Sequence, residues 1–474
     1  MDRYKLYING KWTETGNWDT VTDKYTGEPY AEVALAGNAE LDAACAAAGR
    51  SFAQTRALSA FQRAEILDAI SSELKRRAEE IARVIAVEGG KTWKYALGEA
   101  ARAHETFTFA AGIARTLHGE TVPMDASSRG GDYFGMWIRE PVGVVGAITP
   151  FNFPLNLVAH KVAPAIAAGC PIVLKPAGTT PITALKLAEI IEQTEWPDGA
   201  FNVIHGSGRT IGMGLVQDPR VAKLTFTGSV EVGKTIKQHS GLKRVTLELG
   251  NNSPVVVDET ADIAHAVSQC VMGAFSHGGQ VCISVQRIYV HDSVADEFID
   301  QFVKQTQALK IGHPLDQDAD VSGLISVMET DRVELWVKEA VADGAKVLTG
   351  GKRIGKRVYQ PTVLINTRKE MKVWSDEIFG PVVLIEPVST FDEGLKLADD
   401  TRFGLQAGVF TSRIDQMFAS IRELNFGGIM VNEVPTFRVD QMPYGGNRNS
   451  GIGREGLRFA VDEMTNIKMV AVRV

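Results

Sequence analysis

The fold is decided by a stretch in the first half of the chain, VGVVGAITPFNFP at residues 142–154. Its apolar beginning predicts a buried strand, and the two prolines near its end fix the shape of the following loop. Similar apolar runs recur at residues 172–174, 201–204, 221–226 and 244–249, with helical patterns between them, notably at 181–193 and 230–239. Short strands that alternate with helices indicate a parallel sheet covered by helices on both faces.

A second series of the same kind fills the C-terminal half. Strands are expected near residues 255, 288, 383, 409 and 429, again with helices between them. At 474 residues the chain is too long for one ordinary core, so we expect two α/β domains joined near Leu249 and Gly250. Ahead of the first series, residues 7–12 predict a hairpin with an Asn-Gly turn, and residues 59–88 and 94–117 show helical patterns.

Two further segments fit neither sheet. Residues 132–139 and 466–473 alternate roughly between polar and apolar side chains, as exposed strands do. A strand at the end of a chain needs a partner for its backbone groups. The two segments can pair with each other or with a neighbouring subunit, and the sequence leaves both open.

Composition disfavours several classes of function. Apolar residues make up 45% of the chain and charged residues 23%, and the net charge of −7 disfavours binding to nucleic acid or anionic membranes. No apolar run approaches the length of a membrane span, and the charged start MDRYK differs from a signal peptide, so we expect a cytoplasmic protein. The four cysteines form no C-x-x-C pair and no histidine cluster accompanies them, so neither a disulfide framework nor a metal site is expected.

One cysteine, Cys282, follows the sequence GGQV at positions 278–281, whose two small glycines leave the backbone accessible. A nucleophilic thiolate needs such access, and neighbouring backbone amides can stabilise an oxyanion. On its own the motif favours a structural cysteine over a nucleophile.

Two polar residues near strand ends can complete a catalytic site. Glu248 ends the strand at the expected domain junction, where α/β sheets place ligands and where a carboxylate can act as a general base on water. Asn152 lies in the rigid loop after the first strand, so its amide N–H is a suitable oxyanion donor. A solvated strand-end glutamate and a turn-forming asparagine are the plainer interpretations.

Other motifs favour a dinucleotide. Residues 226–233 read as a strand, a glycine turn and a helix start, whose N-terminus can bind a pyrophosphate with Ser229 as N-cap. Lys175 ends the strand at 172–174 and can contact an adenosine ribose or its 2′-phosphate. Glu377 and Phe379 precede a strand of the second domain and can reach across the cleft to the nicotinamide half.

Together these motifs closely resemble the aldehyde dehydrogenase superfamily. Residues 150–154, 175–176, 226–229, 248–250, 279–282, 377–381 and 443–446 appear in that family's order and spacing over essentially the whole chain. The resemblance implies an α/β fold with two doubly wound parallel-sheet domains. These are a Rossmann-like cofactor domain at 1–118 and 142–248 and a catalytic domain at 249–454, joined by a small β oligomerisation domain at 119–141 and 455–474. A homodimer or homotetramer follows by the same analogy.

The resemblance also implies a mechanism. Cys282 attacks the carbon of a small aldehyde, while Asn152 and the Cys282 backbone N–H hold the oxyanion. A hydride passes to the nicotinamide, and Glu248 activates the water that hydrolyses the resulting thioester to the acid. The cofactor contacts implied in this way are Thr149, Pro150, Lys175, Gly178, Gly208, Phe226, Gly228, Ser229, Gly233, Leu249, Glu377 and Phe379.

Some positions depart from the commonest family pattern, namely Phe151, Asn251 and residues 447–449, and none of them removes a catalytic group. Three rival interpretations remain. A CoA-acylating dehydrogenase typically lacks the glutamate, so Glu248 argues for water as acceptor. A catalytically silent structural protein on this fold would not need the intact catalytic set. A cysteine hydrolase would need a histidine base, and His277 is the closest in sequence.

The cofactor is expected to be NADP or NAD, with NADP used at least as well. NAD-preferring relatives often carry a glutamate three residues after the strand-end lysine, and here that position is Gly178. Without that carboxylate a 2′-phosphate meets no repulsion, while Lys175 attracts it, and Arg209 beside Gly208 can add to the attraction.

For the substrate, residues 282–287 and 431–440 resemble a subgroup of lactaldehyde, phosphonoacetaldehyde and non-phosphorylating glyceraldehyde-3-phosphate dehydrogenases. Phosphonate-binding relatives can carry a histidine and an arginine where this chain has the apolar Phe153 and Val281. A doubly charged group there would lose hydration without bidentate partners. Arg102 and Arg438 remain as anion contacts, or as structural ion-pair residues, so we expect a short aldehyde with an α-hydroxyl or one carboxylate. Oxidation of glyceraldehyde 3-phosphate or phosphonoacetaldehyde is the alternative.

Overall fold

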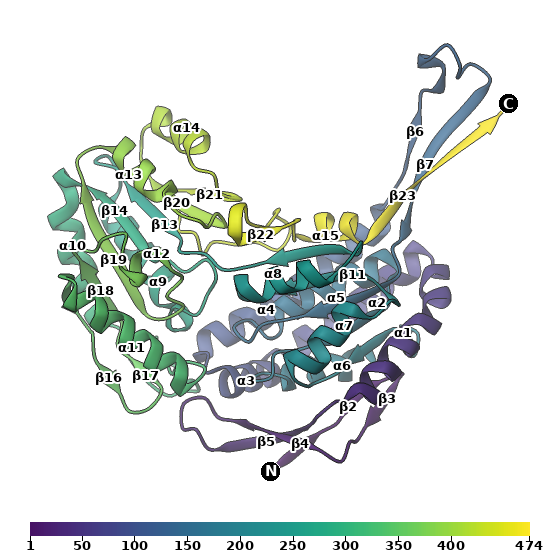
Figure 1. Cartoon of the computed structure of the whole chain (residues 1–474), viewed down its shortest axis with the longest axis horizontal. Helices are drawn as coiled ribbons and strands as arrows, with labels where there is room; N and C mark the ends of the chain where they lie inside the picture. Colours follow the sequence, from purple (N-terminus) through teal and green to yellow (C-terminus); the bar gives the residue numbers. More distant parts are fainter.

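The computed structural model describes residues 1–474, and the first of its two large sheets contains the first series of predicted strands (Figure 1). Five parallel strands form its centre, and short antiparallel strands extend it on both edges. In spatial order the strands are β22 (Gly451–Ile452), β12 (Arg244–Glu248), β11 (Val221–Thr227), β8 (Val144–Ile148), β9 (Ile172–Lys175), β10 (Phe201–Val203), β2 (Leu6–Ile8) and β3 (Lys11–Thr13).

Helices cover both faces of this sheet because successive strand residues point to opposite sides. Ile172 and Leu174 of β9 belong to one apolar cluster, while Val173 between them belongs to another. The helices of the first cluster are α2 (Ala60–Arg76), α3 (Ala78–Gly89), α4 (Trp93–Thr116), α5 (Asn156–Ala168), α6 (Ile182–Ile191) and α15 (Leu457–Glu463), and those of the second are α1 (Asn38–Ala57), α7 (Met213–Gln217) and α8 (Val230–His239).

The second sheet has seven strands and follows the same rule. Its strands are parallel except β15, and in spatial order they are β15 (Lys346–Thr349), β18 (Thr362–Ile365), β19 (Val382–Val388), β14 (Arg287–His291), β13 (Pro254–Val257), β20 (Gln406–Phe410) and β21 (Gly428–Val431). Val255 and Val257 contribute to one apolar cluster and Val256 to the other. The helices of this half are α9 (Ile263–Phe275), α10 (Asp292–Gln307), α11 (Val327–Ala342), α12 (Lys372–Ser375), α13 (Phe391–Asp399) and α14 (Ile414–Glu423).

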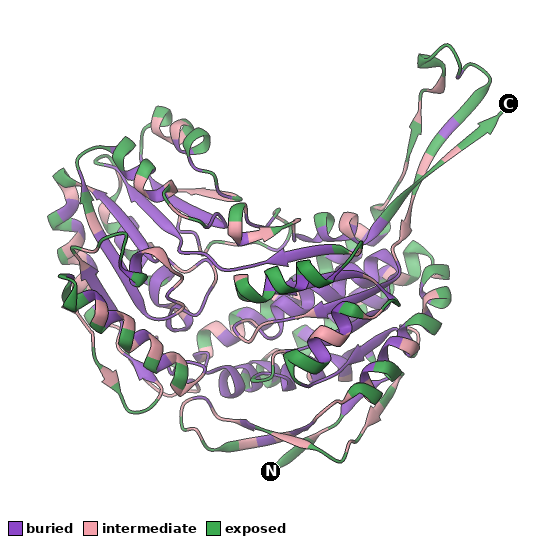
Figure 2. Ribbon diagram, in the orientation of Figure 1, coloured by how far each residue is buried: buried purple, intermediate pink, exposed green.

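A narrow three-stranded sheet projects from the body and carries the C-terminus at its tip (Figure 1). In it β7 (Tyr133–Pro141) pairs along its whole length with β23 (Thr465–Arg473), and its residues 135–137 pair with β6 (Glu120–Val122). The two alternating segments of the sequence therefore pair with each other within one chain. The arm is mostly exposed, unlike the buried central strands of both large sheets (Figure 2).

Smaller sheets complete the architecture. One joins β1 (Asp2–Tyr4), β5 (Pro29–Ala34) and β4 (Trp18–Thr22), and another joins β16 (Arg353–Ile354) to β17 (Val358–Tyr359). The predicted Asn9-Gly10 turn is confirmed, since both residues have positive φ, as a tight hairpin between β2 and β3 requires.

The helical pattern at residues 59–88 forms two helices instead of one. Arg77, with φ −96° and ψ 13°, ends α2 and precedes α3. The Arg77 guanidinium pairs with Glu80 and Glu189, which fixes the turn. A periodic apolar pattern does not separate one long helix from two that share a core, because both bury the same side chains.

Candidate active site

Four strand ends of the first sheet bring predicted site residues to one edge. Glu248 is the last residue of β12, Lys175 the last of β9, Thr149 follows β8 and Gly228 follows β11. These strands are parallel neighbours, so their carboxyl ends meet on the same side of the sheet. This is the edge at which open α/β sheets bind ligands.

Cys282 lies after a tight turn that follows α9. His277, Gly278 and Gly279 have φ of 50°, 62° and 71°, all in the left-handed region. A Cβ on Gly279 would lie 2.1 Å from the Gly380 carbonyl oxygen, so no larger residue fits there. Unlike the three other cysteines, Cys282 is only partly buried, and its Sγ lies 3.1 Å from the Tyr444 hydroxyl. Burial raises the pKa of the Cys282 thiol to about 12.

Asn152 lies beside the segment that carries the cysteine. Its Nδ2 donates a hydrogen bond of 3.0 Å to the carbonyl oxygen of Gln280. The amide nitrogen carries two hydrogens, so one remains available. Asn152 is buried and its Oδ1 has no partner.

Glu248 is buried, and neither carboxylate oxygen has a hydrogen-bond partner. Burial, and then the nearby charge of Glu455, raise the pKa of Glu248 well above its ordinary value. A Cβ on Gly445 would lie 3.0 Å from Glu248 Oε1, so the loop that carries Tyr444 packs directly against the carboxylate. An unpaired buried carboxyl with a raised pKa is suited to exchanging a proton.

Tyr444 lies against the predicted substrate residue Arg438 and close to two buried residues, Lys161 and Glu455, to which the sequence assigned no role. The guanidinium of Arg438 lies 3.6 Å from the centre of the Tyr444 ring and pairs with Glu455 at 3.3 Å. Lys161 pairs with the other oxygen of Glu455 at 2.6 Å and is completely buried. Tyr444 stood in a family motif of the sequence, but its contact with Cys282 spans 162 positions and no local pattern reveals it.

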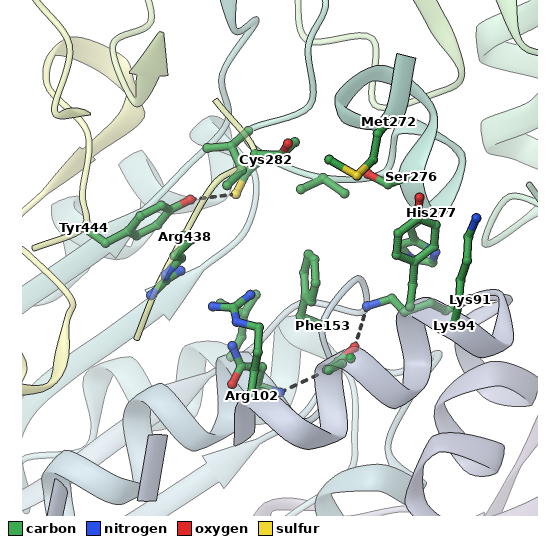
Figure 3. A pocket seen from close by; sticks show the side chains of 18 residues that line it. Lys91, Lys94, Arg102, Phe153, Met272, Ser276, His277, Cys282, Arg438 and Tyr444 are labelled. Atoms are coloured by element: carbon green, nitrogen blue, oxygen red, sulfur yellow. Dashed lines mark hydrogen bonds and ion pairs between the residues drawn. The ribbon is translucent and has the colours of Figure 1, made fainter. Parts of the chain in front are cut away.

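A cavity of about 390 Å³ opens beside Cys282 (Figure 3). The four residues predicted to contact substrate all line it, namely Arg102, Phe153, Val281 and Arg438. Its wall also includes residues that the sequence did not single out for substrate contact: Lys91, Lys94, Tyr95, Glu99, Asn156, Met272, Ser276, His277, Thr436 and Tyr444.

Arg102 is held at the cavity wall by a buried carboxylate. Oδ1 of Asp440 accepts hydrogen bonds from Arg102 at 2.7 Å and from His160 at 2.8 Å, and lies 3.4 Å from the amide nitrogen of Asn156. Burial lowers the pKa of His160 to about 4, so this imidazole is neutral at neutral pH. The hydrogen bond from His160 and the charge of Arg102 hold the pKa of Asp440 below its usual range, against the effect of burial.

Polar groups suited to a dinucleotide remain unpaired at the strand ends. Oγ1 of Thr149 is buried without a partner, and Lys175, also buried, bonds only to the neighbouring Pro176 carbonyl oxygen, at 3.1 Å. Burial lowers the pKa of Lys175 to about 8. Ser229 is the N-cap of α8, and its hydroxyl makes no capping hydrogen bond. Thr149, Lys175 and Ser229 therefore fit a ligand rich in hydroxyl and phosphate oxygens.

The remaining cofactor candidates surround these groups. Pro150 follows Thr149, and a Cβ on Gly228 or Gly233 would approach Phe226 or Leu249 within 2.6 Å. Gly178 and Gly208 are exposed, and a Cβ on either would meet nothing within 4 Å. Arg209 is exposed beside Gly208.

Two candidates come from the second half of the chain. Oε1 of Glu377 accepts a hydrogen bond of 3.0 Å from the backbone N–H of Asn251, and burial raises the pKa of Glu377 to about 7. Phe379, with φ 47°, packs edge-on against Phe151 at 5.8 Å between ring centres. Glu377 and Phe379 thus lie against residues that immediately follow strands of the first sheet.

Comparisons with known proteins agree with this architecture. The sequence model of the aldehyde dehydrogenase family matches residues 12–470. A 3-sulfolactaldehyde dehydrogenase of Priestia megaterium is 42% identical over 100% of this chain and 99% of its own length. A lactaldehyde dehydrogenase of Methanococcus aeolicus is 41% identical over 98% of this chain and 99% of its own length.

Among solved structures, aldehyde dehydrogenase 21 of Physcomitrella patens, in complex with the reaction product succinate, superposes with a TM-score of 0.98 at 41% identity. The superposition spans 100% of this chain and 98% of the Physcomitrella chain. The chain belongs to the aldehyde dehydrogenase family. It is an NAD(P)-dependent enzyme that oxidises aldehydes. No helix combines the length and apolar character needed to cross a membrane.

Proposed function

We propose that this enzyme oxidises a short aldehyde, bearing an α-hydroxyl or one negative charge, to the acid through a thioester on Cys282. The observation that carries the proposal is the cavity itself. Cys282 opens into it, Arg102 and Arg438 lie in its wall, and the unpaired carboxyl of Glu248 lies close by.

The steps follow from the groups around the sulfur. Sγ of Cys282 adds to the aldehyde carbon, and the free N–H of Asn152 stabilises the oxygen that becomes negative. A nicotinamide held at the strand ends would supply the acceptor for the hydride that leaves that carbon, and Cys282 would then carry the substrate as a thioester. Glu248 then removes a proton from water, whose oxygen attacks the thioester and frees the acid and the thiol. Its buried, unpaired carboxyl makes water the proposed acceptor in place of CoA.

For the cofactor we propose NADP, with NAD as a second substrate. Thr149 and Ser229 supply hydroxyls, and Lys175 an ammonium group bonded only to the Pro176 carbonyl oxygen, for the adenosine and phosphate half. Glu377 is proposed to hold the nicotinamide ribose. The open space at Gly178 accommodates a 2′-phosphate without a repelling carboxylate. One related structure, glyceraldehyde-3-phosphate dehydrogenase GapN of Methanocaldococcus jannaschii, is a complex with NADP, at 38% identity and a TM-score of 0.93. The superposition spans 97% of this chain and 100% of the GapN chain.

Charge supports a substrate with a single negative group. The ion pairs in and directly behind the cavity wall contain five cations, Lys91, Lys94, Arg102, Lys161 and Arg438, and four anions, Glu99, Asp320, Asp440 and Glu455. The set therefore has one positive charge in excess, which one carboxylate or sulfonate balances.

Phosphorus-bearing aldehydes suit this wall less well. Phe153 and Val281 add no donor, and the four cations that line the cavity are already paired with carboxylates. A dianion would bring one more negative charge than the wall can balance. The names of the related enzymes, for 3-sulfolactaldehyde and lactaldehyde, and the succinate bound to the Physcomitrella enzyme fit the same class of substrate.

A substrate panel tests the proposal. We expect lactaldehyde, succinate semialdehyde or 3-sulfolactaldehyde to give the highest kcat/KM, with propanal below them. A tenfold or greater lead for phosphonoacetaldehyde or glyceraldehyde 3-phosphate would contradict the substrate class. Absence of NAD(P)H formation with every aldehyde would contradict the activity.

We further propose a homodimer or homotetramer that uses the β6–β7–β23 arm. Phe134, Ile138, Ile467, Met469 and Val472 are exposed there, and such an apolar surface favours contact with a second copy. Light scattering on the intact protein measures the assembly, and a monomer at micromolar concentration would contradict it. Location in the cytoplasm stays a prediction from the sequence.

A further inference from the structure

His277 is a buried imidazole in the substrate cavity that the mechanism above does not use. Only 4% of its surface is exposed, and neither Nδ1 nor Nε2 has a hydrogen-bond partner. Leaving both ring nitrogens unpaired in a buried site is unfavourable, since each has lost its contact with water. The side chain lines the same cavity as Cys282, so a ligand there can reach it.

The backbone of His277 also departs from ordinary geometry. Its φ of 50° lies in the left-handed region, which non-glycine residues seldom adopt. Its carbonyl oxygen accepts hydrogen bonds from the backbone N–H of Gln280 at 3.2 Å and from its side chain at 3.1 Å. The turn that presents Cys282 thus fixes the backbone of His277 and leaves the imidazole free for another role.

The charged side chains of the wall, in contrast, form ion pairs with other residues of the protein. Lys91 pairs with Glu99 and lies 3.6 Å from the centre of the Phe153 ring, and Arg102 and Arg438 pair with Asp440 and Glu455. Figure 3 shows His277 beside Ser276 and Met272, across the cavity from Tyr444 and Arg438, with Phe153 between the two sides. The cavity therefore has polar side chains on two opposite sides, Tyr444 and Arg438 on one and Ser276 and His277 on the other.

We propose that His277 is a substrate-specificity residue that donates a hydrogen bond to an oxygen on the tail of the aldehyde. This inference rests on the proposed function, because it assigns a contact to the same substrate. The tail oxygen belongs to a hydroxyl or to a carboxylate or sulfonate, and an N–H donor recognises the chemistry that these groups share. A purely alkyl tail would leave the imidazole unpaired and is disfavoured for that reason.

The chemistry of the side chain agrees with a neutral donor. Burial, and then the nearby positive charge of Lys91, lower the pKa of His277 well below its ordinary value. A neutral imidazole keeps one N–H and one acceptor nitrogen. His277 can therefore orient a tail without adding to the charge of the wall.

Two variants test the proposal in the full-length enzyme. His277→Gly removes the imidazole and suits the left-handed backbone, while His277→Asn tolerates that backbone and keeps an N–H donor. Each is compared with the unaltered enzyme by kcat/KM for propanal, lactaldehyde, succinate semialdehyde and 3-sulfolactaldehyde. We expect His277→Gly to lose about tenfold or more on at least one oxygen-bearing aldehyde, mostly through KM, and less than threefold on propanal. His277→Asn should recover part of that loss.

The substrates identify the tail group. A loss confined to lactaldehyde assigns the contact to a hydroxyl, and a loss confined to the two charged aldehydes assigns it to an anion. An equal loss on propanal would reveal a purely structural role and overturn the proposal, as would no loss on any substrate.

A binding measurement separates this inference from the proposed function. The acids lactate and succinate are titrated into Cys282→Ala by calorimetry, with and without His277→Gly. We expect His277→Gly to weaken binding of at least one acid about tenfold or more. Equal affinities for both acids in the two proteins overturn the role of His277 whatever the activity. If the unaltered enzyme oxidises no aldehyde, the proposed function fails, and the calorimetric comparison still decides the role of His277.

Discussion

Replacing Gly178 with glutamate adds a carboxylate where we expect the 2′-phosphate of NADP. Gly178 is exposed, its φ lies outside the left-handed region, and a Cβ there meets nothing within 4 Å. The side chain is therefore accommodated without disturbing the end of β9, and any effect on the cofactor is electrostatic.

The size of the effect follows from the charges. Two unit charges 4 Å apart in water interact by about 1 kcal/mol, and a 2′-phosphate carries nearly two negative charges. Repulsion of about 2 kcal/mol corresponds to about thirtyfold in kcat/KM for NADP. Salt screens an exposed pair, so we expect this value at low ionic strength and a smaller one in high salt.

Parallel measurements of kcat/KM for NADP and NAD form the assay. The NADP to NAD ratio should fall about thirtyfold in Gly178→Glu, and less than threefold in Gly178→Gln, which has nearly the same size but no charge. An unchanged ratio in the glutamate variant would refute the assignment of the 2′-phosphate to this position. A hundredfold preference of the unaltered enzyme for NAD would refute the preference that we infer from Gly178.

Three further outcomes are expected. Glu248→Gln should give a burst of NAD(P)H followed by steady-state turnover at least a hundredfold lower, because the buried base for hydrolysis is lost. Stopped-flow kinetics measure both phases, and an unchanged steady-state rate would remove Glu248 from the mechanism. Asp440→Asn should raise the KM for succinate semialdehyde about tenfold or more, because Arg102 loses the carboxylate that holds it. The KM for propanal should change less than threefold, and equal effects on both aldehydes would contradict this role. His160 has a folded pKa of about 4 against about 6.5 unfolded, so the unfolded chain binds the extra proton and stability falls as pH drops from about 6.5 to 4. His160→Gln should flatten that part of the urea-derived stability curve, and an unchanged slope contradicts the neutral state of His160.

The regular part of the fold was predictable from local patterns. The five central strands of the first sheet and helix α8 appear as distinct apolar or amphipathic runs, and the structure confirms them within about two residues. The split at Arg77 was missed because both helices bury the same periodic face. The antiparallel β22 is only two residues long, too short to leave a periodic signal.

The candidate site shows the same division. Cys282, Glu248 and Asn152 stand in short motifs at strand ends and turns, so the sequence identifies them. The sequence did not predict that Tyr444 and His277 line the substrate cavity, because their positions depend on contacts that form only when the chain folds. The Tyr444 hydroxyl meets a residue 162 positions away, and the imidazole of His277 is buried without a hydrogen-bond partner, which no sequence pattern encodes.

The central claim is that Cys282 forms a covalent bond with the aldehyde. Its most direct test is the rate of NAD(P)H formation by Cys282→Ala, with Cys270→Ala as the control because that cysteine is completely buried in the second half of the chain. The account predicts no turnover in Cys282→Ala with cofactor affinity unchanged, and near-normal turnover in Cys270→Ala. Dehydrogenase activity that survives in Cys282→Ala would contradict it.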